Sequence, residues 1–186
     1  MATGGVANAG APMKTTVSVY RAFTTSGLIV PHVRIDSGYC WEGSNVSGRY
    51  DAFRCFVGNY IYDPCFSSPV PGDQVVVCPT DPATETAIAI HLTKPLPSTF
   101  AHAPASPGMT PWAVETDSGE VCFFASGASS LVGGLRENYF CGNGGKGNAL
   151  WGFPDRKGQP WTMIETAADA TTLSGGRRVA VRHAWV

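Results

Sequence analysis

The sequence predicts a mostly β protein, either an antiparallel β-sandwich or a partly open barrel, with long loops pinned by disulfides. Three observations lead to this class. Gly (22) and Pro (14) make up about a fifth of the 186 residues, above the roughly 12% usual in proteins, which indicates many turns. Short apolar segments recur between these turns, and six cysteines are available for crosslinks. We therefore expect a helix content below about 15%.

Eight segments are predicted to be strands, because β-branched and aromatic residues alternate there between Gly, Pro, Asp and Ser. They are residues 15–20, 28–35, 74–78, 86–93, 112–116, 120–125, 161–166 and 178–185. Residues 117–119, Asp-Ser-Gly, predict a hairpin turn between two of them. The apolar positions at period two are predicted to form the core, namely Val17, Val19, Ile88, Ile90, Val121, Phe123, Val179 and Val181.

Two segments have weaker patterns. Residues 127–139 are the best helical candidate, limited to a turn or two because Gly133 and Gly134 would each cost about 1 kcal/mol in a helix. Residues 134–152 are rich in Gly and Asn and predict a long mobile loop that carries Lys146 and an exposed Trp151. This loop lacks the strand, spaced glycines and following helix of a nucleotide-binding loop.

The domain organisation follows from length and composition. Residues 1–14 are rich in Gly, Ala and Pro and predict a flexible tether, and residues 15–186 fit a single disulfide-stabilised β domain. The formal net charge of -1 offers no general attraction to nucleic acid or to anionic lipid. We expect no nucleic-acid partner, no cofactor and no membrane contact except through a tether outside these residues.

The cysteines are Cys40, Cys55, Cys65, Cys78, Cys122 and Cys141. Neighbouring cysteines are at least ten positions apart, whereas zinc sites use C-x2-4-C pairs, so no metal site is predicted. Disulfides in an oxidising compartment are expected instead, which predicts a secreted or cell-surface protein. We predict local pairing, Cys40 with Cys55, Cys65 with Cys78, and Cys122 with Cys141, because each pair encloses a turn-rich segment with few strand residues.

Cys40 also lies in a Gly-aromatic-Cys-Trp run that resembles the surroundings of a papain-type catalytic cysteine. Such a cysteine lies at the start of a helix, whose N-terminus stabilises the thiolate. Residues 42–48, EGSNVSG, form a turn sequence instead. We therefore predict that Cys40 is half of a disulfide.

A candidate binding site lies at residues 49–63, on both sides of Cys55, where charged and aromatic residues interleave. It comprises Arg49, Asp51, Arg54, Asn59, Tyr60, Tyr62 and Asp63. Aromatic faces and bidentate arginines could bind a cell-envelope glycan or peptide. The alternative is internal, with the arginines and aspartates paired to each other and to loop carbonyls.

Two other functions remain open. A secreted hydrolase could use His183 or His91 with Asp51 or Asp63, and His183 shares a strand face with Val179 and Val181, which predicts that it points toward the core or a pocket rim. A structural part of a surface assembly would fit the low charged fraction of 15% and the many glycines, so self-assembly is not excluded.

Several short motifs carry a resemblance to a known group of proteins. They are C-W-x-G-S at 40–44, R-x-D-A-F-R-C at 49–55, G-N-x-I-Y-D-P-C-F at 58–66, V-x-C-P at 76–79, L-T-K-P-L-P at 92–97 and the final A-W at 184–185. Over residues 16–186 the chain resembles secreted or lipid-anchored cell-envelope domains of actinobacteria that have no assigned function. The resemblance implies a location outside the membrane and carries over no catalytic residue. The function predicted from the sequence is therefore a noncatalytic extracellular binding or sensor module.

Overall fold

The computed structural model describes residues 12–98, 103–142 and 147–186. The strands are β1 (Thr16–Ser18), β2 (His32–Gly43), β3 (Ala52–Val57), β4 (Tyr60–Ser67), β5 (Val75–Asp81), β6 (Thr86–Leu92), β7 (Ala113–Thr116), β8 (Val121–Phe124), β9 (Leu131–Val132), β10 (Leu135–Cys141), β11 (Asn148–Asp155), β12 (Trp161–Ala167) and β13 (Arg177–Trp185). These described residues contain no helix, and hence none long and apolar enough to cross a membrane. The predicted mostly β fold with disulfide-pinned loops is confirmed.

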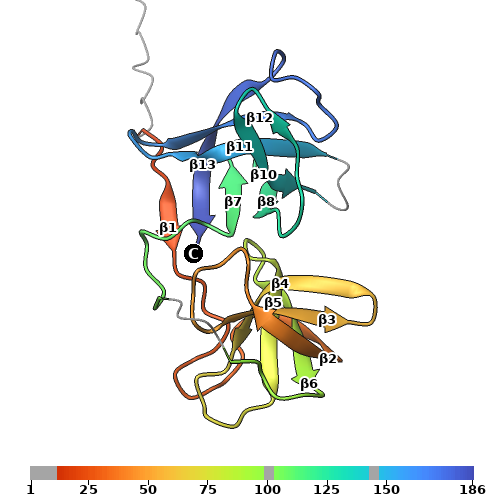
Figure 1. Ribbon diagram of the computed structural model, residues 1–186. Helices are drawn as coiled ribbons and strands as arrows, with labels where there is room; N and C mark the ends of the chain where they lie inside the picture. Colours follow the sequence, from red (N-terminus) through yellow and green to blue (C-terminus); the bar gives the residue numbers. More distant parts are fainter. Residues whose placement is uncertain (1–11, 99–102, 143–146) are drawn as a thin grey trace, which may run out of the picture.

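Strands β2 to β6 form a closed barrel, which we call barrel 1 (Figure 1). Successive strands pair antiparallel, and because their number is odd, β2 and β6 close the barrel in parallel register. Close contact between β2 and β3 depends on Gly38, because a Cβ there would lie 2.0 Å from the carbonyl oxygen of Phe56.

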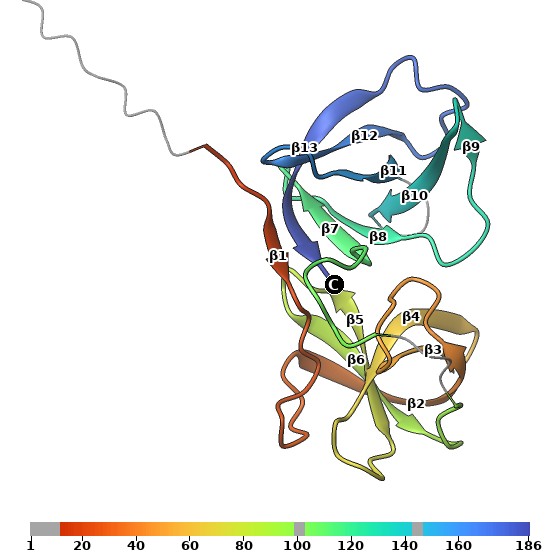
Figure 2. The same ribbon diagram turned by 60° about the vertical axis from the view of Figure 1, so that its left-hand side comes forward.

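The second half of the chain forms barrel 2, in which strands β7, β8, β10, β11, β12 and β13 pair in turn and β13 returns to β7. Strand β9 pairs with β10 outside this circuit, and β1 adds in parallel to the C-terminal end of β13. Strand β1 is thus an edge strand, and Figure 2 shows it at the margin of the molecule, where the chain passes from barrel 2 to barrel 1.

One buried cluster joins the two barrels, and we call it the interbarrel cluster. Its members are Tyr20, Ala22, Val46, Ala52, Phe66, Val77, Ala87, Ala89, Trp112, Ala113 and Trp185. The C-terminus lies beside it between the barrels (Figure 1), where the carbonyl of Val186 accepts a hydrogen bond from the Tyr20 amide at 3.0 Å. The span 15–186, predicted as one domain, thus contains two barrels with a shared core.

Of the eight residues predicted to form the core, the four in β6 and β13 are buried. Ile88, Ile90, Val179 and Val181 are at most 3% exposed, whereas Val17, Val19, Val121 and Phe123 are only partly buried. Strand β6 is buried on both faces, because Ala87 and Ala89, on the face opposite to Ile88 and Ile90, pack into the interbarrel cluster. Period-two patterning therefore identified the strands but not how many of their faces are covered.

Strands β3 and β4, and β9 to β11, lie outside the eight segments predicted as strands. Two-residue turns join them: Gly58 and Asn59 connect β3 to β4, and Gly133 and Gly134 connect β9 to β10. Both glycines of the second turn have positive φ angles, +57° and +79°, as a type I′ hairpin requires. These Gly-Asn and Gly-Gly pairs are the signal that would have predicted the strands.

The prediction of an exposed Trp151 in a mobile loop is wrong. Trp151 lies in β11, is 2% exposed, and its indole Nε1 donates to Thr166 Oγ1 at 2.8 Å. Pairing of β11 with both β10 and β12 places this residue inside a sheet, which composition could not indicate. Lys146, predicted in the same loop, lies outside the described residues.

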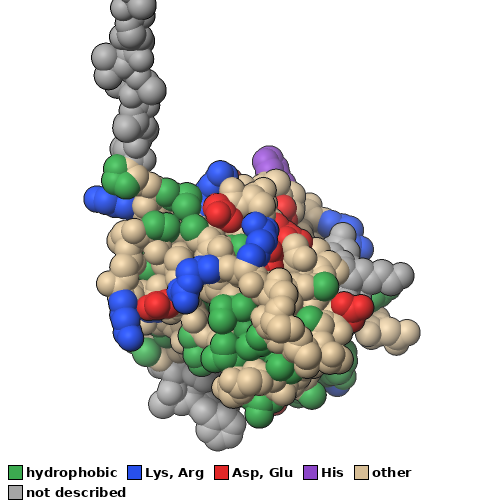
Figure 3. Space-filling model, turned by 90° about the horizontal axis from the view of Figure 1, so that it is seen from above, with side chains coloured by type: hydrophobic (Ala, Val, Ile, Leu, Met, Phe, Trp, Pro, Cys, Tyr) green, Lys and Arg blue, Asp and Glu red, His purple; other side chains and the backbone are tan. Residues whose placement is uncertain are grey.

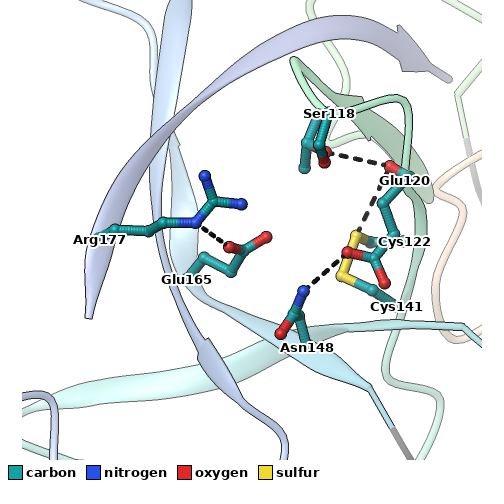
Figure 4. Close-up of a disulfide and its surroundings, with 8 residues drawn as sticks. Ser118, Glu120, Cys122, Cys141, Asn148, Glu165 and Arg177 are labelled. Atoms are coloured by element: carbon teal, nitrogen blue, oxygen red, sulfur yellow. Dashed lines mark hydrogen bonds and ion pairs between the residues drawn. A yellow bond between two sulfur atoms is a disulfide. The ribbon is translucent and has the colours of Figure 1, made fainter. Parts of the chain in front are cut away.

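The three predicted disulfides are confirmed, Cys40–Cys55, Cys65–Cys78 and Cys122–Cys141. The reason differs from the expected one, because each bond joins two neighbouring strands rather than the ends of a loop. Cys122 and Cys141 are direct partners across β8 and β10, and the segment between them contains β9 and most of β10. Figure 4 shows this bond near the ion pair of Glu165 with Arg177. No cysteine of the chain is free.

Candidate functional site

Two residues of the predicted binding cluster, Arg49 and Asp51, hold the fold together from inside. Their side chains form a bidentate ion pair, with Arg49 Nε and Nη2 at 2.9 and 2.6 Å from the two Asp51 carboxylate oxygens. Arg49 is 6% exposed, donates from Nη1 to the Tyr20 carbonyl at 2.7 Å and packs over the Phe66 ring. The internal pairing foreseen as the alternative is therefore present, and it occupies the guanidinium group.

Arg54 and Asp63 form a second internal network. The Arg54 guanidinium lies 3.1 Å from a carboxylate oxygen of Glu42 and 3.7 Å from one of Asp63. The Asp63 carboxylate is 1% exposed and accepts hydrogen bonds from Ser44 Oγ and from the Asn45 amide. Burial raises the pKa of Asp63 to about 6, although these hydrogen bonds act to lower it.

The remaining three residues of the predicted cluster differ in exposure. Asn59 and Tyr60 lie at the tip of the β3–β4 hairpin, and Tyr60 is 71% exposed. Tyr62 is half-buried against the core of barrel 1. The seven predicted residues therefore divide between internal contacts and one exposed tip, and binding at that tip stays a prediction.

A groove between the two barrels, with a volume of about 520 Å³, is a candidate site. Its floor comes from residues 18–21 with Glu115, His183 and Trp185 of barrel 2. Its wall comes from residues 30–31 and from the β5–β6 loop of barrel 1, which contributes Pro82, Ala83 and Glu85. The β1–β13 and β7–β13 pairings bring three strands of the floor together.

A serine and a histidine are in direct contact on this floor. His183 Nε2 lies 2.8 Å from Ser18 Oγ, and the imidazole stacks on Trp185 with ring centroids 4.2 Å apart and planes 6° from parallel. Burial lowers the pKa of His183. Glu115, which pairs with His183 where β7 lies beside β13, acts to raise it. The imidazole is therefore neutral at pH 7 and able to accept a proton. The predicted pocket-rim position of His183 is confirmed.

Two further polar residues line the groove, Glu85 on the wall and Tyr20 on the floor. Glu85 is exposed and has a φ angle of +54°, in the left-handed region where glycine and asparagine are usual. Burial, followed by the nearby Glu85 charge, raises the pKa of Tyr20 to about 12. The Tyr20 hydroxyl is buried and has no hydrogen-bond partner in the described part of the chain.

Sequence reasoning identified His183 but missed its neighbours in the groove. Ser18 and His183 are 165 positions apart, and Glu85 reaches the groove from the other barrel. None of these residues belongs to a recognisable motif. Only the docking of two barrels brings them to one place.

Seen from the barrel 2 end, Lys and Arg side chains alternate with Asp and Glu side chains, without a large field of one sign (Figure 3). No three His, Cys, Asp or Glu residues in ranges 12–98, 103–142 and 147–186 are grouped so that they could hold a metal ion.

The groove therefore offers hydrogen-bonding, acidic and apolar groups in one concave surface, which is the usual form of a ligand site. Comparison of the chain with protein families, with curated proteins and with solved structures finds no match.

Proposed function

We propose that this protein is an extracytoplasmic, noncatalytic binding or sensor module of a bacterial cell envelope. Its ligand, a glycan or a peptide, lies in the groove between the barrels. The observation that carries the proposal is the groove itself, about 520 Å³ in volume, in which Ser18, His183 and Glu85 converge from both barrels. Three disulfides are consistent with a location outside the cytoplasm. The envelope assignment rests on the resemblance of the short sequence motifs.

The groove is a better candidate than the predicted cluster at 49–63. Most polar atoms of that cluster already have partners within the protein, since Arg49 and Asp51 bind each other and Asp63 binds Ser44. A ligand would have to replace these buried contacts, at a cost in free energy. Arg21, Ala83 and Glu85 of the groove are exposed, and a ligand can reach them without replacing a buried contact.

The experiment is a titration followed by amide NMR shifts, with soluble peptidoglycan fragments, an N-acetylglucosamine tetramer and short blocked peptides as probes. We expect shifts concentrated at residues 18–21, 82–85 and 183–185. His183→Ala should weaken binding at least about fivefold, the effect of losing roughly one hydrogen bond and one packing contact. His91→Ala is the matched control, because His91 is exposed on β6 and does not line the groove.

Two results would reject the groove as the site. One is that no probe shifts its residues at millimolar concentration. The other is that shifts concentrate at Asn59 and Tyr60, which would return the site to the hairpin tip predicted from the sequence.

A hydrolase is the second candidate, and the contact between Ser18 Oγ and His183 Nε2 at 2.8 Å favours it. In such a reaction the Ser18 oxygen attacks the carbonyl carbon of an ester while His183 accepts the hydroxyl proton. The proton then passes to the departing alcohol, and water hydrolyses the acyl-enzyme. Asp51 and Asp63, the predicted acidic partners, bind Arg49 and Ser44, whereas Glu115 is the carboxylate that acts on the pKa of His183.

The two candidates are separated by a covalent test. A fluorophosphonate probe should label Ser18 if the serine is activated, and Ser18→Ala should abolish labelling and any ester turnover. Ser37→Ala, an exposed serine outside the groove, is the control. A protein that stays unlabelled while it binds a probe ligand is the result we expect from a noncatalytic module.

A further inference from the structure

We propose that the ligand of the interbarrel groove is an extended peptide that carries a lysine or arginine side chain. This inference rests on the proposed function, because it names the class of ligand for the same groove. The peptide pairs its backbone with residues 19–21 beside β1 and places its cationic side chain between Glu85 and Glu115.

The first argument concerns the backbone next to β1. Ser18 accepts a hydrogen bond from the Val186 amide and Tyr20 donates one to the Val186 carbonyl, both at 3.0 Å. In an extended chain, successive residues direct their amide and carbonyl groups to opposite sides. Val19 lines the groove, and neither its amide nor its carbonyl has a partner in the described part of the chain. The same holds for Arg21.

Unpaired donors and acceptors on an edge strand are what an added peptide strand binds. Val19 and Arg21 therefore offer alternate hydrogen-bonding positions to a peptide backbone.

The second argument disfavours a glycan. A sugar ring packs its C–H groups on the open face of an aromatic side chain. Trp185 is 5% exposed, and the imidazole of His183 already covers one of its faces. Tyr20 is 7% exposed and packs against Phe66 and Trp112. Neither Trp185 nor Tyr20 thus presents a free face to the groove, whereas the peptide groups of Val19 and Arg21 are free in the described part of the chain.

The third argument is charge complementarity. Two carboxylates line the groove, Glu115 on the floor and Glu85 on the wall, against a single basic residue, Arg21. Glu115 has an ion pair with Arg182 at 3.3 Å, while Glu85 has none in the described part of the chain. A carboxylate without an ion pair, such as that of Glu85, attracts a cationic side chain and repels an acidic one.

The geometry at Glu85 agrees with this role. A residue with a Cβ is less stable than glycine in the left-handed region, because its Cβ comes too close to the following carbonyl oxygen. Glu85 occupies that conformation at a loop position where glycine would be more stable. A glutamate there is understandable if its carboxylate contacts a ligand.

The experiment uses calorimetry with a blocked pentapeptide, Val-Lys-Val-Lys-Val, on the intact oxidised protein. Three comparison probes are the same peptide with Glu for Lys, the same peptide N-methylated at every amide, and the N-acetylglucosamine tetramer. We expect the lysine peptide to bind at least about tenfold more tightly than the other three, because each lacks either the charge or the backbone donors.

Two variants test the contacts separately. Val19→Pro removes an amide that the fold does not use, and proline is tolerated on edge strands, so it should keep the melting temperature and lose about tenfold in affinity. Glu85→Gln should lose about fivefold for the lysine peptide and remove part of the salt dependence of binding. Asp169→Asn, an exposed carboxylate outside the groove, should change neither.

Each outcome has a distinct meaning. Equal binding of the lysine and glutamate peptides, or unimpaired binding of the N-methylated peptide, overturns the inference. Binding of the tetramer in the groove without peptide binding overturns the inference and leaves the proposed function intact. Failure of every probe at the groove overturns both. If Val19→Pro does not fold, Glu85→Gln and the N-methylated peptide still decide the case.

Discussion

At the residue scale, Asp63 determines a pH dependence of stability. Folding raises its pKa from 3.8 to about 6 by burial, so the folded protein binds this proton more tightly than the unfolded chain. The free energy of unfolding should therefore be highest below about pH 4 with respect to this group and fall as pH rises to about 6. The full loss is roughly 3 kcal/mol at about 1.4 kcal/mol per pKa unit. Chemical denaturation between pH 4 and 7.5 measures it.

The control for this effect is Asp63→Asn. The amide oxygen can accept only one of the two hydrogen bonds that Ser44 Oγ and the Asn45 amide donate to separate carboxylate oxygens, which lowers stability by an amount independent of pH because the side chain does not titrate. The difference between wild type and variant should thus change with pH in the interval from about 4 to 6. Parallel stability curves for the two proteins over that interval would show that Asp63 is not the group responsible.

At the element scale, the disulfides fasten strands that already pair. The bond between Cys122 and Cys141 crosses β8 and β10 and spans 19 positions. Replacing both cysteines by alanine keeps the backbone hydrogen bonds between the strands but raises the conformational entropy of the unfolded chain. The free energy of unfolding should therefore fall by about 3 kcal/mol. Guanidinium denaturation of the variant with its other two disulfides oxidised gives the value. An unchanged transition midpoint would mean that strand pairing alone holds β8 and β10.

At the scale of the whole molecule, Arg49 connects the two barrels. Its guanidinium binds Asp51 of barrel 1, the carbonyl of Tyr20 and, at 3.4 Å, that of Val186. Arg49→Met would leave a partly buried carboxylate and the Tyr20 carbonyl without their partner, and should cost about 3–5 kcal/mol of stability. The loss is measured as a shift of the urea unfolding transition.

Arg34→Met is the matched control for the loss of an arginine. Arg34 is 63% exposed and lies 3.5 Å from Asp36, so its ion pair is worth at most about 1 kcal/mol. Similar losses in the two variants would contradict the interbarrel role of Arg49.

The sequence by itself determined what depends on near neighbours along the chain. It predicted the β class from turns and short apolar segments, the hairpin at 117–119, and the disulfide pairs, whose cysteines are 13 to 19 positions apart. Local pattern is enough for these features because a tight turn or a short crosslink involves few residues. His183 lines the groove for a reason that alternation does not contain, because the register shifts after Val181 and Ala184 instead of His183 continues the buried face of Val179 and Val181.

Tertiary structure alone decided how the strands close and what they cover. Barrel closure depends on the register between strands far apart in sequence, as in the pairing of β2 with β6 and of β7 with β13. It buries both faces of β6 and places Trp151 within a sheet. The groove depends on the docking of the barrels, which brings Ser18 beside His183 across 165 positions. Such contacts leave no local pattern, because each strand shows which of its faces are apolar but not which partner will meet them.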